Sequence, residues 1–255
     1  MSLVHAADEH VEDDNLSSEL EDSSYSNYLE SKCSSIFFGM TCREAFGLTY
    51  YTWREYNKDG TQYIRDIGGL ARVEFNMIDY DSKDSETNYK FGLYVGLFKY
   101  RNEHKEECLN VYVGGLFEAR EVFYMAKFGD LEILTGTTAW FRTVETEFWM
   151  PLYIKTGIKL HYDDYYFRIG TLIPLGIIEY SNFRNLGYVK LTPKLVNTGY
   201  AEIGMPLSKR WQLSFQYDTW KWGESAHKVV GSTDWTIWQP PSENDLFSLR
   251  LEHKF

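Results

Sequence analysis

Apolar and polar residues alternate with a period of two along most of the chain after residue 46. In LARVEFNMIDY, Val73 and Phe75 share one parity, whereas Arg72 lies on the other. Because successive side chains of a β-strand point to opposite faces, such stretches predict strands with one apolar and one polar face. No long segment has the 3.6-residue period of a helix, so the pattern predicts an all-β protein.

The alternation predicts ten strands between residues 46 and 255. They are Phe46–Tyr56, Asp66–Tyr80, Asn88–Arg101, Cys108–Lys127, Leu131–Thr146, Pro151–Tyr162, Tyr165–Tyr180, Tyr188–Leu207, Trp211–Trp222 and Leu246–Phe255. The eighth contains Pro193 and Pro206, which leaves open a division into two strands near Asn197. In the seventh, Phe167, Ile169, Ile173, Leu175 and Ile177 are assigned to the apolar face. Eight or twelve strands remain open as alternatives.

The connections between these strands differ in length according to their order. The second, fourth, sixth and eighth are Asp81–Thr87, Phe128–Asp130, Asp163–Asp164 and Ser208–Arg210; the others are Asn57–Arg65, Asn102–Glu107, Glu147–Met150, Ser181–Gly187 and Gly223–Asp245. Short turns at one end and longer loops at the other are typical of outer-membrane barrels. Glu147–Met150 is an exception to the trend.

Two architectures are compatible with the alternation. A soluble sandwich or lipocalin-like barrel turns its apolar face inward, whereas a transmembrane barrel turns it outward to lipid. Most predicted strands reach the roughly 9–11 residues that cross a bilayer, and soluble strands cluster near about 5–6. Aromatic residues form 17% of the chain and gather at strand ends, among them Trp53, Trp149, Trp220 and Trp222. This favours interfacial girdles around a transmembrane barrel.

The final stretch, LFSLRLEHKF, carries a family resemblance. Phe247, Leu249 and Leu251 share one parity, and the chain ends on Phe255. This resembles the C-terminal signature by which the assembly machinery recognises Gram-negative outer-membrane β-barrels, although His253 replaces the usual apolar residue. The resemblance covers ten residues and implies a closed antiparallel up-and-down barrel in the bacterial outer membrane. Its last strand would pair with the first and remove both sheet edges.

Residues 1–45 are expected to form a separate N-terminal segment before the barrel at 46–255. Ala7–Glu30 has nine acidic residues and no Lys or Arg, which predicts partial disorder. Residues 1–7 resemble the end of a secretory signal peptide. In an oxidising compartment Cys33 and Cys42 are the candidate disulfide, with Cys108 free, although three unrelated thiols are equally compatible with the sequence.

The polar parity identifies residues expected to line the barrel lumen. They are Arg72, Glu74, Lys90, Tyr94, Tyr112, Glu132, Arg142, Lys155, Lys159, Arg168, Gln216, Asp218, Arg250 and Glu252. The full polar-parity set also contains Asn110, Glu118, His161, Glu202, Gln212 and Lys254 and has eight Lys or Arg against six acidic residues. This near balance predicts side chains that fill the lumen with ion pairs or line a tight pore. We expect a narrow channel or porin for small solutes. A closed structural or adhesive barrel acting through its outer loops is the alternative, and a soluble lipocalin-like barrel is a third.

Other functions receive little support from the sequence. No serine-hydrolase, zinc-protease or phosphate-loop motif occurs, and His161 beside Asp163 and Asp164 is the best acid–base cluster. We therefore expect no enzyme, with an outer-membrane lipid hydrolase or protease as the minor alternative, and no metal or cofactor. The net charge of −11 disfavours nucleic acid. The expected partners are membrane lipid or lipopolysaccharide, small solutes, and the assembly machinery through the Phe255 strand.

Overall fold

The computed structural model describes residues 40–79, 85–101, 107–126, 129–142, 147–182, 187–231 and 234–254. Within these ranges it describes the side chains of all residues except 107, 126, 140 and 142. In this part of the chain, no helix is long and apolar enough to span a membrane.

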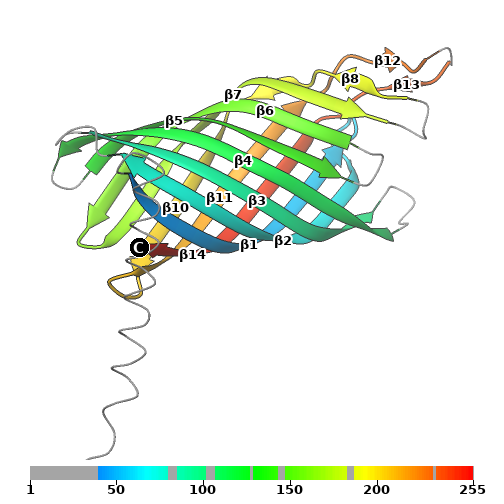
Figure 1. Ribbon diagram of the computed structural model, residues 1–255. Helices are drawn as coiled ribbons and strands as arrows, with labels where there is room; N and C mark the ends of the chain where they lie inside the picture. The colour runs from blue at the N-terminus through cyan, green and yellow to red at the C-terminus, as the bar shows by residue number, and fades with distance from the viewer. Residues whose placement is uncertain are drawn as a thin grey trace, which may run out of the picture.

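Ten long antiparallel strands form a closed barrel (Figure 1). They are β1 (Thr41–Tyr56), β2 (Gln62–Asp79), β3 (Ser85–Arg101), β4 (Glu107–Ala126), β5 (Gly129–Arg142), β6 (Glu147–Tyr162), β7 (Tyr165–Ser181), β10 (Thr198–Pro206), β11 (Trp211–Gly223) and β14 (Ser242–Lys254). Neighbours in the chain pair from β1 to β7, and β10 pairs with β7. β14 pairs with both β1 and β11, so the barrel has no open edge. The predicted all-β, ten-stranded up-and-down barrel is confirmed.

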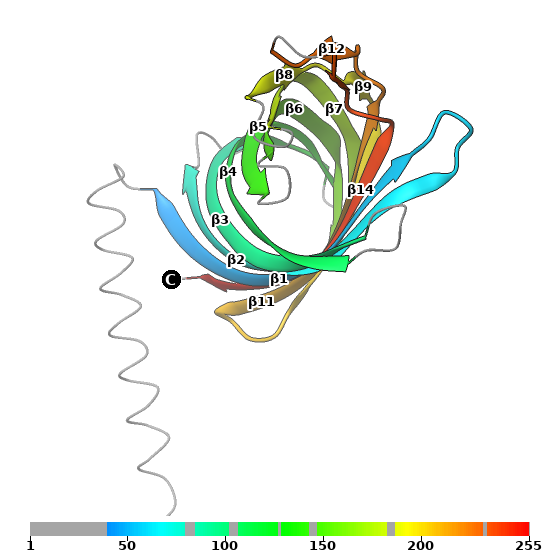
Figure 2. The ribbon, with the colours of Figure 1, turned by 90° about the vertical axis from the view of Figure 1, so that its right-hand side faces the viewer.

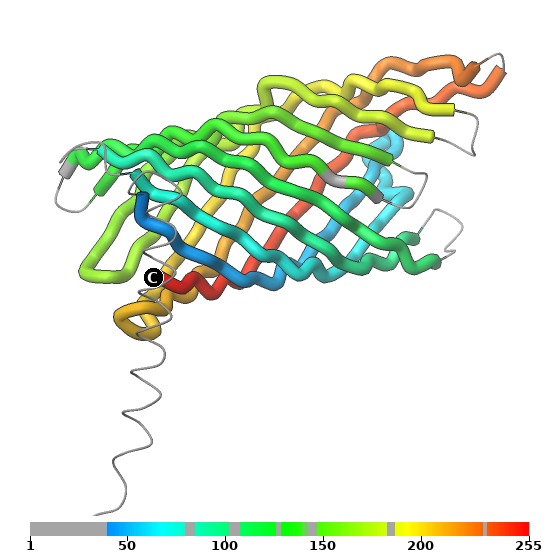
Figure 3. The backbone as a smooth tube through the Cα atoms, in the orientation of Figure 1, coloured from blue at the N-terminus to red at the C-terminus, as the bar shows by residue number. Residues whose placement is uncertain are grey.

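Several strand boundaries differ from the prediction. β1 begins at Thr41 rather than Phe46, because it pairs with β2 as far as Ile78. At the other end β1 and β2 pair up to Tyr56 and Gln62, which shortens the first connection to residues 57–61. Glu147–Met150 belongs to β6 rather than to a loop, since its residues pair with β5 and β7. The tube in Figure 3 shows these extended strands crossing the barrel obliquely, as closure requires.

The two longest connections carry short strands of their own. Between β7 and β10 lie β8 (Val189–Leu191) and β9 (Lys194–Val196), and β10 starts at Thr198, so the eighth predicted strand is divided. Between β11 and β14 lie β12 (Lys228–Val229) and β13 (Thr236–Ile237), which pair as a hairpin. These segments gather at one end of the barrel (Figure 2). We call β8, β9, β12 and β13 with their connecting residues the cap.

The apolar face of the strands points outward. Leu93 is 72% exposed and Val73 is 54% exposed, whereas Arg168 and Glu202 are buried. A soluble sandwich or lipocalin-like barrel has the opposite arrangement. The exterior is therefore suited to hydrocarbon, and the polar face fills the interior.

One part of the seventh strand reverses this pattern. Leu152 pairs with Gly176 and Tyr153 with Pro174, so Leu175 is an extra residue that forms a β-bulge in β7. Beyond the bulge the parity changes, and Ile177 packs against the interior core instead of facing outward. Its assignment to the outer face, made by continuing strict alternation, was wrong. The bulge also accommodates Pro174, which has no N–H for the ladder.

Candidate functional site

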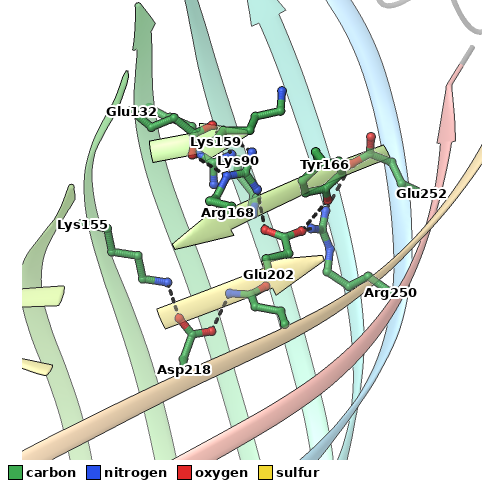
Figure 4. Close-up of polar contacts among 12 residues, drawn as sticks. Lys90, Glu132, Lys155, Lys159, Tyr166, Arg168, Glu202, Asp218, Arg250 and Glu252 are labelled. Atoms are coloured by element: carbon green, nitrogen blue, oxygen red, sulfur yellow. Dashed lines mark hydrogen bonds and ion pairs between the residues drawn. The ribbon is translucent and has the colours of Figure 1, made fainter. Parts of the chain in front are cut away.

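A network of buried ion pairs crosses the middle of the barrel (Figure 4). Arg168 of β7 bridges Glu132 of β5 and Glu202 of β10. Arg250 of β14 contacts Glu202 at 3.2 Å and Glu74 of β2 at 2.9 Å. A buried charge is tolerated when it has a partner of opposite sign, and removing one partner typically costs about 3–5 kcal/mol. The network therefore ties five strands together through the barrel interior.

A second set of charges links side chains of β3, β4, β6 and β11 inside the barrel. The Lys155 ammonium lies 2.8 Å from Asp218 and 3.6 Å from Glu118. Lys90 approaches the same Glu118 at 3.4 Å, and the Tyr153 hydroxyl donates a hydrogen bond to it at 2.7 Å. Each of these charges is thus compensated within the barrel. The arrangement leaves no interior field of a single sign along these contacts.

An aromatic cluster fills the barrel on the side of the network that faces the cap. Trp53, Trp149 and Trp222 are at most 2% exposed. The rings of Trp53 and Trp149 are 5.0 Å apart, and those of Trp149 and Trp222 are 5.8 Å apart. Trp53 Nε1 donates a hydrogen bond to Glu55, which satisfies its polar edge. We call this cluster, which also contains Tyr51, Leu70, Phe98, Tyr112, Leu134, Tyr153, Leu172 and Trp220, the aromatic layer.

The aromatic layer corrects one expectation. Trp53, Trp149, Trp220 and Trp222 were predicted to belong to girdles around the exterior, yet all four are buried inside. Position near a strand end was the wrong signal, because it does not distinguish the two faces. Parity predicts an interior position for these tryptophans. Trp220 and Trp222, for example, share the parity of Asp218, which was assigned to the lumen. Tyr162, at 73% exposed, is an aromatic strand end that does face outward.

The space left inside the barrel is unequal on the two sides of the network. Next to the aromatic layer, a cavity of only about 60 Å³ is lined by Tyr94, Tyr153 and Trp220, among others. At the end opposite the cap, a polar cavity of about 500 Å³ has Lys159 and Arg120 in its wall. We call this larger cavity the vestibule. The barrel is thus open to water at one end and packed at the other.

The residues expected to line the lumen occupy the following positions. Glu74, Lys90, Tyr112, Glu132, Lys155, Arg168, Asp218 and Arg250 are buried, and Arg72, Tyr94, Lys159, Gln216 and Glu252 are half-buried. The side chain of Arg142 and the terminal Phe255 lie outside the described part of the structure. Glu202 has the parity of these residues and forms a central bridge of the network, so the same reasoning identifies it.

The sequence-derived candidate residues outside the network are also placed. His161 contacts Asp130 at 3.4 Å in the vestibule wall, where Asp163 and Asp164 also lie. Cys42 is disulfide-bonded and Cys108 is free and exposed; Cys33, the expected partner of Cys42, lies outside the described residues. No group of three or more metal-ligating side chains occurs in the described ranges.

The cap is a small folded unit. Leu191, Val230 and Ile237 form its core, which joins the β7–β10 connection to the β12–β13 hairpin. The backbone N–H of Ser225 donates to Gln239 O at 2.9 Å, and Gln239 N–H donates to Ser225 Oγ at 2.8 Å. These contacts join the two ends of the segment that carries the β12–β13 hairpin.

The cap also exposes aromatic surface. Trp235 is 53% exposed, and Trp238 is 39% exposed with the His227 ring stacked on it at 4.4 Å. His227 Nε2 donates a hydrogen bond to Glu224 at 3.2 Å, which lowers the pKa of that carboxyl. Exposed tryptophans next to charged groups make this the most distinctive accessible surface of the cap.

Comparisons with known proteins find similar chains only among solved structures. No family model and no curated protein matches the chain. Among solved structures, the outer-membrane protease OmpT of Escherichia coli is 7% identical, with a TM-score of 0.44 over 84% of this chain and 97% of that one. An outer-membrane channel of Pseudomonas putida F1 is 9% identical, with a TM-score of 0.42 over 85% and 96%. The translocator domain of the autotransporter NalP of Neisseria meningitidis is 11% identical, with a TM-score of 0.45 over 94% and 98%.

The assignment to a membrane follows from the barrel itself. In hydrocarbon every backbone polar group needs an internal partner, and only helices and closed barrels meet that condition. This barrel is closed, most of the exposed side chains on its wall are apolar, and the ion-pair network lies inside it. Together these features identify the chain as a transmembrane β-barrel.

Proposed function

We propose that this chain is a closed outer-membrane barrel that acts through its cap. The observation that carries the proposal is the aromatic layer, whose four tryptophans are at most 5% exposed. Such a layer, together with the ion-pair network, separates the vestibule from the cap side and leaves no continuous passage for hydrated solutes through the described interior. The barrel then serves as a rigid anchor, and binding occurs where side chains are accessible.

The orientation of the barrel supports a surface role for the cap. Outer-membrane barrels have short periplasmic turns and longer external loops. In this chain the turns at residues 163–164 and 207–210 lie at the end opposite the cap. The cap would therefore face the cell exterior. Its exposed Trp235 and Trp238 offer the flat aromatic contacts that are enriched at binding hot spots.

A narrow channel for small solutes is the second candidate. The vestibule favours it, because a polar cavity of about 500 Å³ reaches from one end of the barrel to the ion-pair network. Conduction would require the aromatic layer to rearrange. The likeness to OmpT carries no argument for proteolysis in this chain.

Planar-bilayer recording separates the two candidates. The purified barrel is expected to give no stable single-channel currents, whereas the double variant Trp149→Ala/Trp222→Ala is expected to conduct because it removes two indoles from the aromatic layer. Heat-modifiable gel migration verifies that both proteins are folded. Stable currents from the unaltered barrel would overturn the closed-barrel proposal in favour of the channel.

Adhesion of cells that display the barrel tests the role of the cap. Trp235→Ala/Trp238→Ala is expected to reduce adhesion to protein- or glycan-coated surfaces at least fivefold, because both exposed indoles are lost. Tyr162→Ala is the matched control, since Tyr162 is an exposed aromatic at the opposite end. Equal adhesion of all three proteins at equal surface levels would remove the cap from the function.

A further inference from the structure

The outer wall of the barrel carries a compact group of charges on its lipid-facing side. Arg54 of β1 pairs with Asp245 of β14 and lies 3.2 Å from Glu243. Lys221 of β11 lies 2.8 Å from the same Glu243. The Tyr217 hydroxyl donates a hydrogen bond to Asp245 at 2.8 Å. We call Arg54, Lys221, Glu243 and Asp245 the outer charge cluster.

The strand register shows that this cluster faces outward. Glu243 and Asp245 have the parity of Phe247 and Leu249, which are 51% and 39% exposed on the apolar exterior. Charged groups on that side are costly in hydrocarbon, and the cost decreases toward the interface. The cluster lies near the cap-side ends of β1 and β11. Its position therefore corresponds to the headgroup level on the cap side of the membrane.

An apolar groove begins directly below the cluster. Its volume is about 780 Å³, and its wall is almost entirely apolar. Small residues leave it hollow: Gly69 and Ala71 of β2 lie on one side and Ala201 of β10 on the other. At Gly69 an added Cβ would meet no atom within 4 Å. Exterior side chains of six strands contribute to it, namely β1, β2, β7, β10, β11 and β14.

Two aromatic residues connect the groove to the cluster. Phe247 lines the groove and is one outward position below Asp245 in β14. The Tyr217 ring, which also lines the groove, stacks on Phe247 at 4.8 Å while its hydroxyl binds Asp245. The outer wall thus changes from apolar to charged over two residues of β14. An amphipathic ring is most stable at such a boundary.

We propose that the groove and the outer charge cluster form a binding site for one zwitterionic phospholipid with a phosphoethanolamine headgroup. An acyl chain lies in the groove, the phosphate accepts hydrogen bonds from Arg54 and Lys221, and the ammonium group faces Glu243 and Asp245. Two cations and two carboxylates balance in the cluster, which complements a headgroup that carries one charge of each sign. A purely anionic lipid would have to displace the carboxylates.

Lipid retention measured by native mass spectrometry tests this site. The full chain is reconstituted separately with phosphatidylethanolamine, phosphatidylglycerol or lipopolysaccharide and then released into mild detergent. The expected result is one retained phosphatidylethanolamine per barrel, with at least fivefold less phosphatidylglycerol or lipopolysaccharide. Equal retention of all three, or of none, would overturn the proposal. A dimer without lipid would show that a second copy covers the groove.

Substitutions locate the retained lipid. Ala201→Phe fills the groove and is expected to reduce retention at least fivefold, whereas Val95→Phe, on the exterior of β3 outside the groove, leaves it unchanged. Lys221→Gln provides a second test if Ala201→Phe does not fold, because Lys221 is about half exposed. It is expected to weaken phosphatidylethanolamine retention while heat-modifiable migration stays normal. Unchanged retention in folded Ala201→Phe or Lys221→Gln would show that the lipid binds elsewhere.

Discussion

Glycine at the inner wall decides how closely two strands and an aromatic side chain pack together. Gly157 of β6 and Gly170 of β7 are directly paired, and Tyr200 of β10 covers both from inside the barrel. A Cβ at Gly157 would approach the Tyr200 hydroxyl to 2.6 Å, and one at Gly170 would approach the Tyr200 ring to 2.7 Å. Each added Cβ would also collide with backbone carbonyl oxygen of the opposite strand. Neither position has room for a methyl group.

At this residue scale we expect Gly157→Ala to destabilise the barrel by about 1–3 kcal/mol, the usual range for overpacking a filled interior. Gly176→Ala is the control, because its Cβ would meet no atom within 4 Å. The urea midpoint of unfolding, followed by tryptophan fluorescence in lipid vesicles, compares the two variants. Equal midpoints would show that the interior around Tyr200 accommodates the added methyl group without loss of stability.

The bulge in β7 lets the residues before it and the residues after it both place interior side chains inside the barrel. Before it, Arg168 and Leu172 point inward; after it, Ile177 and Glu179 do so. One unpaired residue, Leu175, absorbs the change of parity. A strand with strict alternation would have turned Glu179 toward lipid, where a charge is unfavourable.

Two single-residue deletions test this account at the element scale. Deleting Leu175 is expected to leave a folded, heat-modifiable barrel, because the regular strand that results keeps the same residues inside. Deleting Ile169 is expected to abolish the folded form, because every later residue of β7 before the bulge would change faces. Gel migration before and after heating measures both outcomes. A folded protein from the Ile169 deletion would contradict the role assigned to parity.

The barrel wall as a whole is the reverse of a soluble protein's, because most apolar side chains on the long strands face outward and the ion-pair network lies inside. Leu93 lies at the middle of β3 and is 72% exposed, while Leu109 lies near the cap-side end of β4 and is 70% exposed. The two leucines are similarly exposed but lie at different depths along the barrel axis. Substitutions at the two positions therefore distinguish a surrounding bilayer from water. In water both would tolerate a charge equally well.

We expect Leu93→Arg to destabilise the barrel in vesicles by about 2–4 kcal/mol and Leu109→Arg by about 0–1 kcal/mol, because the cost of a lipid-facing charge falls toward the interface. Urea titration in vesicles measures both free energies of unfolding. If both arginines were tolerated without loss, the apolar exterior would not be facing hydrocarbon.

Much of the fold could be predicted from local pattern. Alternation identified the strands and the two faces, and it assigned residues such as Arg168, Lys155 and Asp218 to the side that is buried in the structure. The pattern did not reveal where alternation is interrupted, and Ile177 was misassigned for that reason. The tryptophans of the aromatic layer were misassigned because strand ends were weighed more heavily than parity.

The sequence by itself determined that this chain is all-β with strands of one apolar and one polar face, since a side-chain period of two is a local property of each strand. Only the tertiary structure decided which charges meet, because Glu202 approaches both Arg168 and Arg250 through barrel closure. It also decided that the interior is packed on the cap side and hollow on the other. These features depend on register and curvature, which join residues far apart in the chain and leave no local periodic signal.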